Sequence, residues 1–317
     1  MGLFTKIKRH AAVAQGNFAQ MFDGARIAPL PEAISRILTE IHKDEPDIGV
    51  LENLIASEPE LSIQILSTVN SSLYALRHQV TSIRHAMALL GLDQIRAVIL
   101  AGAMQKALPR PKNSIFQQEV YWTDTLMRSL LARELTRLHR PGDEEQAFTA
   151  MLISDVAIPV LLDSWAEYYE PILDQWQQQS LGLSSLEKES FGWDHGTAGS
   201  WILQYWGFPM ELVCLVAAHH LPPSKLKDLE LCDTVAADLL VASRLCSCWQ
   251  PDLPRCLGMI DMAEELLGIS PDRWPDIMAV VSDHYSAIHQ QFGLQRSRGD
   301  KVIEIMEQIF ENDRQPS

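Results

Sequence analysis

The chain has 317 residues, of which 47% are hydrophobic and 21% are charged. This is the composition of an ordinary globular protein, and the length suffices for one large or two modest domains. The formal net charge of −15 argues against nucleic acid as a partner, because that affinity depends largely on Lys and Arg neutralising phosphates. We therefore expect no nucleic-acid partner.

The sequence shows no membrane or export signal. Its longest uninterrupted apolar stretches, such as 212–218, fall short of the roughly 20 residues that cross a bilayer. The N-terminus lacks a signal-peptide apolar region, and Lys6 stands where a myristoylation signal has Ser or Thr. We predict a cytoplasmic protein that does not enter the membrane.

All five cysteines lie in the last third of the chain. They form no C-x-x-C motif and no paired zinc spacing, so we expect reduced thiols packed as small apolar groups. The five are Cys214, Cys232, Cys246, Cys248 and Cys256.

Helical periodicity begins behind Leu30 and Pro31. Apolar residues then recur at the i, i+3, i+4 and i+7 spacing of an amphipathic helix. These positions are Ile34, Ile37, Leu38 and Ile41.

A second helix is predicted from the segment S-E-P-E. Ser57 is its expected N-cap, and Glu60 stands at the spacing of a capping box. Its expected buried stripe is Leu61, Ile65, Leu66 and Val69.

Two more short helices are predicted at 82–90 and 93–104. Gly91 between them is the expected C-cap of the first, and Asp93 is the expected N-cap of the second. The N-terminal third is thus a run of short helices.

Helix-breaking and polar residues at 109–114 mark the end of this first part. Helical patterns continue beyond it, and alternating strand patterns are nearly absent, so we predict an all-α fold. The further patterns cover 118–139, 146–176, 196–206, 209–220, 229–248, 255–267 and 273–292.

No phosphate-binding glycine loop and no hydrolase nucleophile motif occurs in the sequence. The chemistry that remains is metal binding by imidazole and carboxylate groups that converge from several helices. The candidates are Asp155, His195, His219, His220 and Asp238.

Each candidate also has a plain structural interpretation. Asp194 is a typical N-cap, which would make His195 a first-turn residue. One of His219 and His220 can cap a helix end while the other packs in the core, and both can face one pocket only if the helix ends there. Asp155 lies in an apolar run, where a buried carboxylate needs partners.

In chain order, these segments resemble the HDOD family, a bacterial signalling relative of the HD and HD-GYP metal phosphohydrolases. The N-terminal half of the match carries I-A-S-E-P-E-L-S-I-Q-I-L at 55–66 and V-T-S-I-R-H-A-M-A-L-L-G at 80–91. The second half carries A-F-T-A-M-L-I-S-D at 147–155, F-G-W-D-H-G-T-A-G at 191–199 and H-H-L-P at 219–222.

The resemblance implies a small N-terminal helical bundle followed by an HD-like helical bundle. It places an extension at 1–24, a helical subdomain at 25–108, an HD-like subdomain at 115–248 and a C-terminal helical extension at 249–317. It also implies that Asp155, His195, His219, His220 and Asp238 are the retained positions of a former metal site.

The departures from the HD-GYP pattern bear on activity. Ser154 replaces the histidine of the His-Asp dyad, and Asp124 stands where an early-helix histidine is expected. The G-Y-P loop after the histidine pair is missing, and P-P-S-K follows instead. A hydrolytic site needs a tightly held metal to lower the pKa of its attacking water, so we expect at most one divalent metal ion and no useful hydrolysis.

The leading hypothesis is a non-catalytic regulatory protein of a bacterial signalling pathway that binds a protein partner or a small ligand. Asn70 and Ser71 are candidate binding residues, with helix termination as their alternative role. The second hypothesis is a metal-dependent phosphohydrolase with an atypical site, and the third is a helical scaffold without a pocket. For His219 and His220 we expect either a single ion or a buried hydrogen-bond network with Asp155 and His195.

Overall fold

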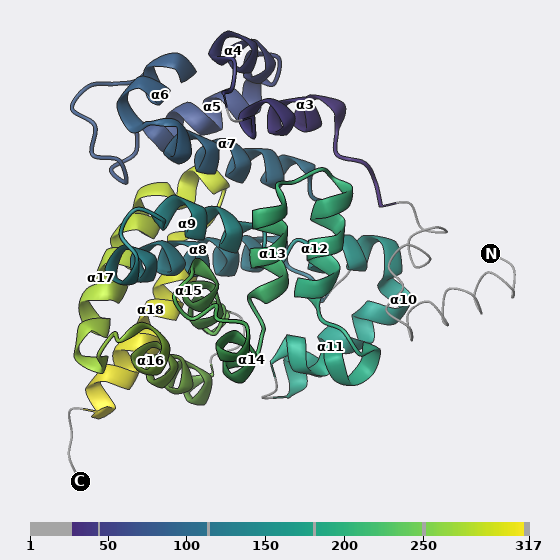
Figure 1. Ribbon diagram of the computed structural model, residues 1–317, viewed down its shortest axis with the longest axis vertical. Helices are drawn as coiled ribbons and strands as arrows, with labels where there is room; N and C mark the ends of the chain where they lie inside the picture. The colour runs from purple at the N-terminus through teal and green to yellow at the C-terminus, as the bar shows by residue number, and fades with distance from the viewer. Residues whose placement is uncertain (1–26, 44, 113–114, 180–181, 249–251, 314–317) are drawn as a thin grey trace, which may run out of the picture.

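The computed structural model describes residues 27–43, 45–112, 115–179, 182–248 and 252–313 (Figure 1). Within these ranges the protein is helical and contains no strand, as the all-α prediction requires. The predicted extension at 1–24 lies outside the described residues.

The first five described helices form the N-terminal bundle, drawn from purple to blue in Figure 1. All four apolar positions predicted for the first helix are buried. In the second helix, Leu66 is only partly buried while the other three predicted positions are buried. The helices are α3 (Glu32–Ile41), α4 (Ile48–Ala56), α5 (Pro59–Val69), α6 (Ile83–Leu90) and α7 (Leu92–Ala107).

The predicted capping box at Ser57 is wrong. Ser57 ends α4, and its hydroxyl donates to the carbonyl of Leu54 at 2.6 Å. Helix α5 begins at Pro59, whose fixed φ and missing N–H suit the first helical position. Proline therefore starts this helix without a side-chain cap.

Gly91 ends α6, as predicted, with a φ of 87° that favours glycine. It also directly precedes α7, which begins at Leu92. The prediction that Asp93 is the N-cap is therefore wrong, since Asp93 lies within the first turn. One glycine makes the whole connection between the two helices.

The second group of helices forms the HD-like bundle. The pattern predicted as continuous from 146 to 176 is interrupted by a turn at 153–156, so Asp155 lies between two helices. The helices are α8 (Gln118–His139), α9 (Glu144–Leu152), α10 (Ala157–Gln178), α11 (Leu183–Phe191), α12 (His195–Tyr205), α13 (Met210–Ala218), α14 (Pro223–Asp228) and α15 (Val235–Ala242).

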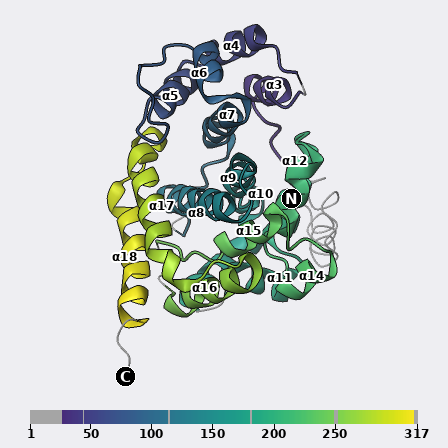
Figure 2. The same cartoon turned by 60° about the vertical axis from the view of Figure 1, so that its left-hand side comes forward.

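The last two helices run along one edge of the molecule and reach from the HD-like bundle to the N-terminal bundle (Figure 2). The side chain of Gln105 on α7 donates to the carbonyl of Phe292 at 2.6 Å, which ties the two ends together. The last helix was not predicted. The elements are α16 (Leu253–Leu267), a 3-10 turn (Pro271–Arg273), α17 (Trp274–Ile288), a second 3-10 turn (His289–Phe292) and α18 (Arg296–Asp313).

The stretch Glu144–Gln178 is long and apolar enough to cross a membrane, but 83% of its most apolar window is buried inside the fold. Its apolar side chains therefore form protein core. All five cysteines are free thiols, as predicted. Cys246, Cys248 and Cys256 are buried, whereas Cys214 is exposed and so does not pack as a core residue.

Candidate metal centre

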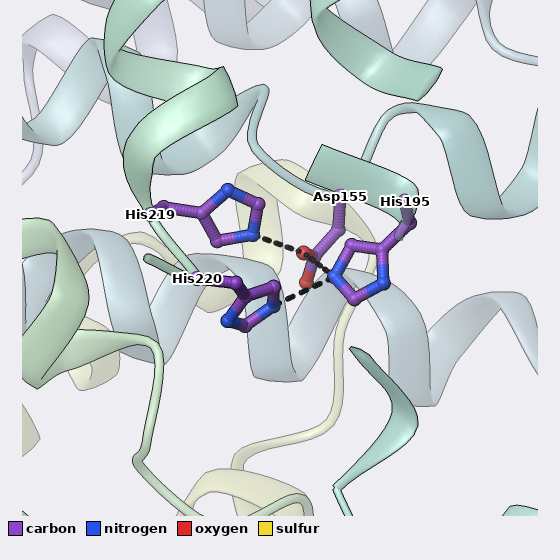
Figure 3. A group of neighbouring side chains, drawn as sticks. All are labelled: Asp155, His195, His219 and His220. Atoms are coloured by element: carbon purple, nitrogen blue, oxygen red, sulfur yellow. Dashed lines mark hydrogen bonds and ion pairs between the residues drawn. The ribbon is translucent and has the colours of Figure 1, made fainter. Parts of the chain in front are cut away.

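Four predicted residues converge at one point in the HD-like bundle: Asp155, His195, His219 and His220 (Figure 3). One potential ligand atom of each lies within 4.8 Å of those of the other three. We call these four residues the histidine–aspartate group. Asp155, His195 and His219 are buried, and His220 is partly buried.

The backbone brings these residues together because each of them stands at a helix end. Asp155 occupies the turn before α10, and His195 is the first residue of α12, behind the N-cap Asp194. His219 is the C-cap of α13, so the helix ends where both histidines must face one site. Both histidines could face one pocket only if their helix ended before Pro222, and α13 does end there.

Close approach of α12 and α13 depends on Gly196. A Cβ at this position would stand 2.9 Å from Cε1 of His219 and 3.1 Å from the carbonyl oxygen of Val216. Real Cβ atoms essentially never come within 3.0 Å of another heavy atom. Glycine therefore lets the start of one helix lie against the end of the other.

The spacing of the ligand atoms fits one small cation. His195 Nε2 lies 2.8 Å from His220 Nε2 and 3.3 Å from Asp155 Oδ1, and His219 Nε2 lies 3.5 Å from that same oxygen. Nitrogen and oxygen ligands at 2.0–2.1 Å from a tetrahedral Zn²⁺ stand about 3.3 Å apart. His219 Nε2 is also buried without a hydrogen-bond partner among the described residues, as an atom reserved for a cation would be.

Outer partners orient two of the three imidazoles. His195 Nδ1 lies 2.6 Å from a carboxylate oxygen of Glu187, and His219 Nδ1 lies 2.6 Å from the carbonyl of Val216. Each contact turns Nε2 toward the centre of the group, as second-shell partners do in metal sites. Glu187 is fully buried and also accepts bonds from the Tyr169 hydroxyl and the His195 amide.

Glu187 and Arg128 are site residues that the sequence analysis missed. Arg128 on α8 donates from Nη1 to Asp155 Oδ2 at 3.0 Å. Apolar periodicity does not mark charged residues: Arg128 lies within a predicted helix, and Glu187 lies on α11, which was not predicted. The signal that the sequence did offer was Asp155, a carboxylate in an apolar run. Such a carboxylate needs a partner when buried, and none had been assigned to it.

Both oxygens of Asp155 are therefore engaged by protein groups. Burial opposes ionisation of this carboxyl, but the contacts with His195, His219 and Arg128 outweigh burial and hold its pKa well below the usual range. Asp155 is an anion at neutral pH.

The two histidines of the shortest contact have opposite protonation states. Burial acts to lower the pKa of His195, but Glu187 and Asp155 together raise it to about 10. Burial and the neighbouring imidazoles hold the pKa of His220 well below its usual range. Protonated His195 therefore donates from Nε2 to neutral His220, and the group is a hydrogen-bond network built around an imidazolium.

The two other predicted ligands lie outside the histidine–aspartate group. Asp124 accepts hydrogen bonds from the Ser247 hydroxyl and the Cys248 amide. Asp238 is fully buried on α15 and lies 3.2 Å from His139 Nδ1 at the end of α8. Each of these carboxylates has its own local partner, which is how a buried charge is tolerated away from a metal.

Ser154 does not point into the site. Its hydroxyl donates to the carbonyl of Met151 at 2.8 Å and so ends the helix α9. The residue that replaces the dyad histidine has thus taken a structural role.

Asn70 and Ser71 also make local hydrogen bonds. The Asn70 side chain accepts from the Val80 amide at 2.7 Å and donates to the carbonyls of Val80 and Leu66. The Ser71 hydroxyl donates to the carbonyl of Thr68 at 2.6 Å. This is the helix-ending role foreseen as their alternative, and a partner-binding role for them stays a prediction.

A cavity of about 90 Å³ adjoins the group. Asp155, His195 and His220 form part of its wall together with Asp124 and Arg128. Much of the remaining wall is apolar and aromatic, from Phe116, Tyr121, Ile158, Leu173, Trp176 and Leu183. The site therefore joins a charged end to an apolar interior, as small-molecule sites commonly do.

Comparison with known proteins identifies the family. The profile of the HDOD domain matches residues 27–222, which is more than half of the chain. The chain belongs to the HDOD domain family. Among proteins with curated descriptions, none matches it significantly. The HDOD match spans the N-terminal bundle and the part of the HD-like bundle that supplies the histidine–aspartate group.

Solved HDOD-like structures share the fold. A presumed phosphohydrolase from Shewanella amazonensis SB2B is 21% identical with a TM-score of 0.65, covering 93% of this chain and 99% of its own. An HDOD domain protein from Geobacter sulfurreducens is 17% identical (TM-score 0.60; 95% and 96% coverage). A presumed signal transduction protein from Marinobacter aquaeolei VT8 is 19% identical (TM-score 0.57; 95% and 64% coverage). At these identities the likeness establishes the HD-like helical architecture alone.

Proposed function

We propose that this HDOD protein is a non-catalytic regulatory module of a bacterial signalling pathway, acting in the cytoplasm by binding a protein partner or a small ligand. One observation carries the proposal. The negative charge of Asp155 is already balanced by Arg128 at 3.0 Å and by protonated His195 at 3.3 Å. A site whose charges are balanced internally does not need a metal to be stable.

The donor set also argues against hydrolysis. Three imidazoles and one carboxylate fill the four positions of a tetrahedral ion, which is the pattern of closed structural sites, whereas catalytic sites keep a position open for water. Such an ion, when bound, would supply Lewis acidity to this group. Arg128 donates to Oδ2 of Asp155, so this second carboxylate oxygen already has a cationic partner.

The regulatory part of the proposal rests on the family. One solved structure of the same fold, 19% identical, is described as a presumed signal transduction protein. The N-terminal bundle, the part that carries the most specific HDOD motifs, contributes no residue to the histidine–aspartate group. It therefore provides a surface that is separate from the degenerate site.

Elemental analysis of untagged protein, combined with a hydrolysis assay on bis-p-nitrophenyl phosphate in Mn²⁺ and in Zn²⁺, tests the proposal. We expect no turnover above that of the Asp155→Ala variant with either metal. Stoichiometric metal together with hydrolysis that Asp155→Ala abolishes would overturn the non-catalytic assignment.

The alternative, a metal-dependent phosphohydrolase with an atypical site, is favoured by one feature. His195 and His219 keep outer partners that turn Nε2 inward, which a decaying site has no need to retain. Turnover that falls in the Glu187→Gln variant, with metal content unchanged, would support this alternative. The non-catalytic proposal instead expects Glu187→Gln to affect folding stability alone.

A further inference from the structure

A second polar region lies beside the metal centre. A groove of about 800 Å³ runs between α11, the segment after α13, the end of α15 and the start of α16. Ser184, His220 and Arg255 line both this groove and the smaller cavity of the histidine–aspartate group. The groove and the cavity are therefore two parts of one recess, with Arg255 at the junction. We call the outer part the arginine groove.

The arginine groove is cationic in an acidic protein. Among the described residues, its walls carry Lys188, Arg244 and Arg255 but only one carboxylate, Asp252. Asp252 is the N-cap of α16, where its side chain accepts the backbone N–H of Arg255. Lys188 is bonded to Asp194 at 2.7 Å. Of the three groove cations, Arg244 and Arg255 are thus the two without a salt bridge to a described carboxylate.

Neither arginine has a carboxylate partner among the described residues. Arg255 makes one side-chain hydrogen bond, to the carbonyl of Ser243 at 2.8 Å, and the Arg244 side chain makes none. The other partly buried arginines in the described ranges each pair with a carboxylate. These are Arg96, Arg128, Arg133, Arg140 and Arg298.

An acidic chain offers a carboxylate to almost any arginine, since it has 41 acidic and 26 basic residues. Two partly buried guanidinium groups without carboxylates are costly, because burial disfavours an unpaired charge. Burial lowers the pKa of Arg244, and burial together with Arg128 lowers that of Arg255 to about 10. An external anion would relieve this cost at both positions.

We propose that the arginine groove binds the phosphate group of a small organic phosphate, with the apolar part of that ligand in the adjoining cavity. The planar donors of guanidinium match the oxygens of phosphate in pairs. Phe116, Tyr121 and Trp176 in the cavity wall provide flat apolar surface for a ring. The groove volume lies within the range typical of small-molecule sites.

This assignment rests on the proposed ligand-binding function and names its ligand class. Its two central residues, Arg244 and Arg255, lie beyond the 27–222 range of the HDOD match. It also requires no metal, because Arg244 and Arg255 are not members of the histidine–aspartate group.

Isothermal titration of the full chain with phenylphosphonate, in EDTA at low salt, tests the proposal. This probe has a dianionic head and an apolar ring, and its C–P bond is not cleaved by a phosphohydrolase. We expect saturable binding that weakens about tenfold or more in Arg244→Gln and in Arg255→Gln, as loss of a charged hydrogen bond predicts. Arg36→Gln, which removes an exposed arginine of α3, is the matched control and should bind as the wild type does.

The Arg244→Gln result decides the matter, because the Arg244 side chain makes no hydrogen bond to the described residues whose loss could disturb the fold. Absent phenylphosphonate binding, or binding that neither arginine variant weakens, overturns the proposal. Equal affinity for inorganic phosphate overturns the role given to the apolar cavity. Hydrolysis of bis-p-nitrophenyl phosphate with intact phenylphosphonate binding would refute the non-catalytic function but leave this inference standing. Absence of both hydrolysis and phenylphosphonate binding would refute this inference and leave the non-catalytic function standing.

Discussion

The histidine–aspartate group and the arginine groove meet at His220 and Arg255. They differ in whether their charged side chains have partners of opposite charge. In the group, Asp155 and Glu187 are balanced by Arg128 and protonated His195 over distances of 2.6–3.3 Å. In the groove, neither Arg244 nor Arg255 forms an ion pair with a carboxylate of the described residues. Protein side chains balance the charges of the group, whereas on our proposal an anionic ligand balances those of the groove.

The largest effect should follow from removing the anion at the centre of the group. Asp155→Asn leaves Arg128 buried without its counter-charge and leaves His195 with Glu187 alone, and breaking a buried pair in this way costs about 3–5 kcal/mol. Urea unfolding followed by circular dichroism measures the loss, with the exposed Asp228→Asn as control. A loss below about 1 kcal/mol would show that the group is not a balanced network.

Crowding the contact between α12 and α13 should have the next largest effect. Gly196→Ala places a Cβ 2.9 Å from His219, and overpacking of this kind costs about 1–3 kcal/mol. Gly258→Ala on α16 is the control, because it meets nothing within 4 Å and should raise stability by up to about 1 kcal/mol. Equal melting temperatures for the two variants would contradict the tight approach at His219.

Zinc affinity should rise with pH. Metal must displace the Nε2 proton of His195, whose pKa is raised to about 10, so protons compete with the metal at every pH below that value. The competition predicts about a tenfold gain in affinity per pH unit from this group alone. Competition with a chelating dye at pH 6, 7 and 8 measures the slope, and a flat profile would refute the imidazolium.

The smallest change should come from the groove. Arg255→Met removes a charge without a carboxylate partner and keeps an apolar stem, so stability should stay within about 1 kcal/mol of the wild type. Arg128→Met, which deprives Asp155 of its cation, is the contrasting variant and should lose about 1–3 kcal/mol. Similar losses in both variants would remove the distinction between the two regions.

Much of the candidate site could be predicted because its residues sit in recognisable motifs. The pair His219 and His220 stands before Pro222, and Asp155 stands in an apolar run. Each signal has a physical cause: the proline ends the helix that carries the histidine pair, and a carboxylate buried in an apolar run needs a partner. Asp238 has an equally apolar setting, but its partner is His139, 99 residues earlier in the chain. Sequence spacing gives no access to such a pair.

The sequence by itself determined the all-α class, most of the buried positions of the first helices and the free thiols, and its family resemblance supplied six candidate ligands, of which the structure brings four together. Those features depend on periodicity, on helix-ending residues and on motifs that are local in the chain. Only the tertiary structure decided which charges are balanced. Arg128, Glu187 and Arg255 acquire their roles from helices that pack side by side, and electrostatic energy depends on distance in space rather than on separation along the chain.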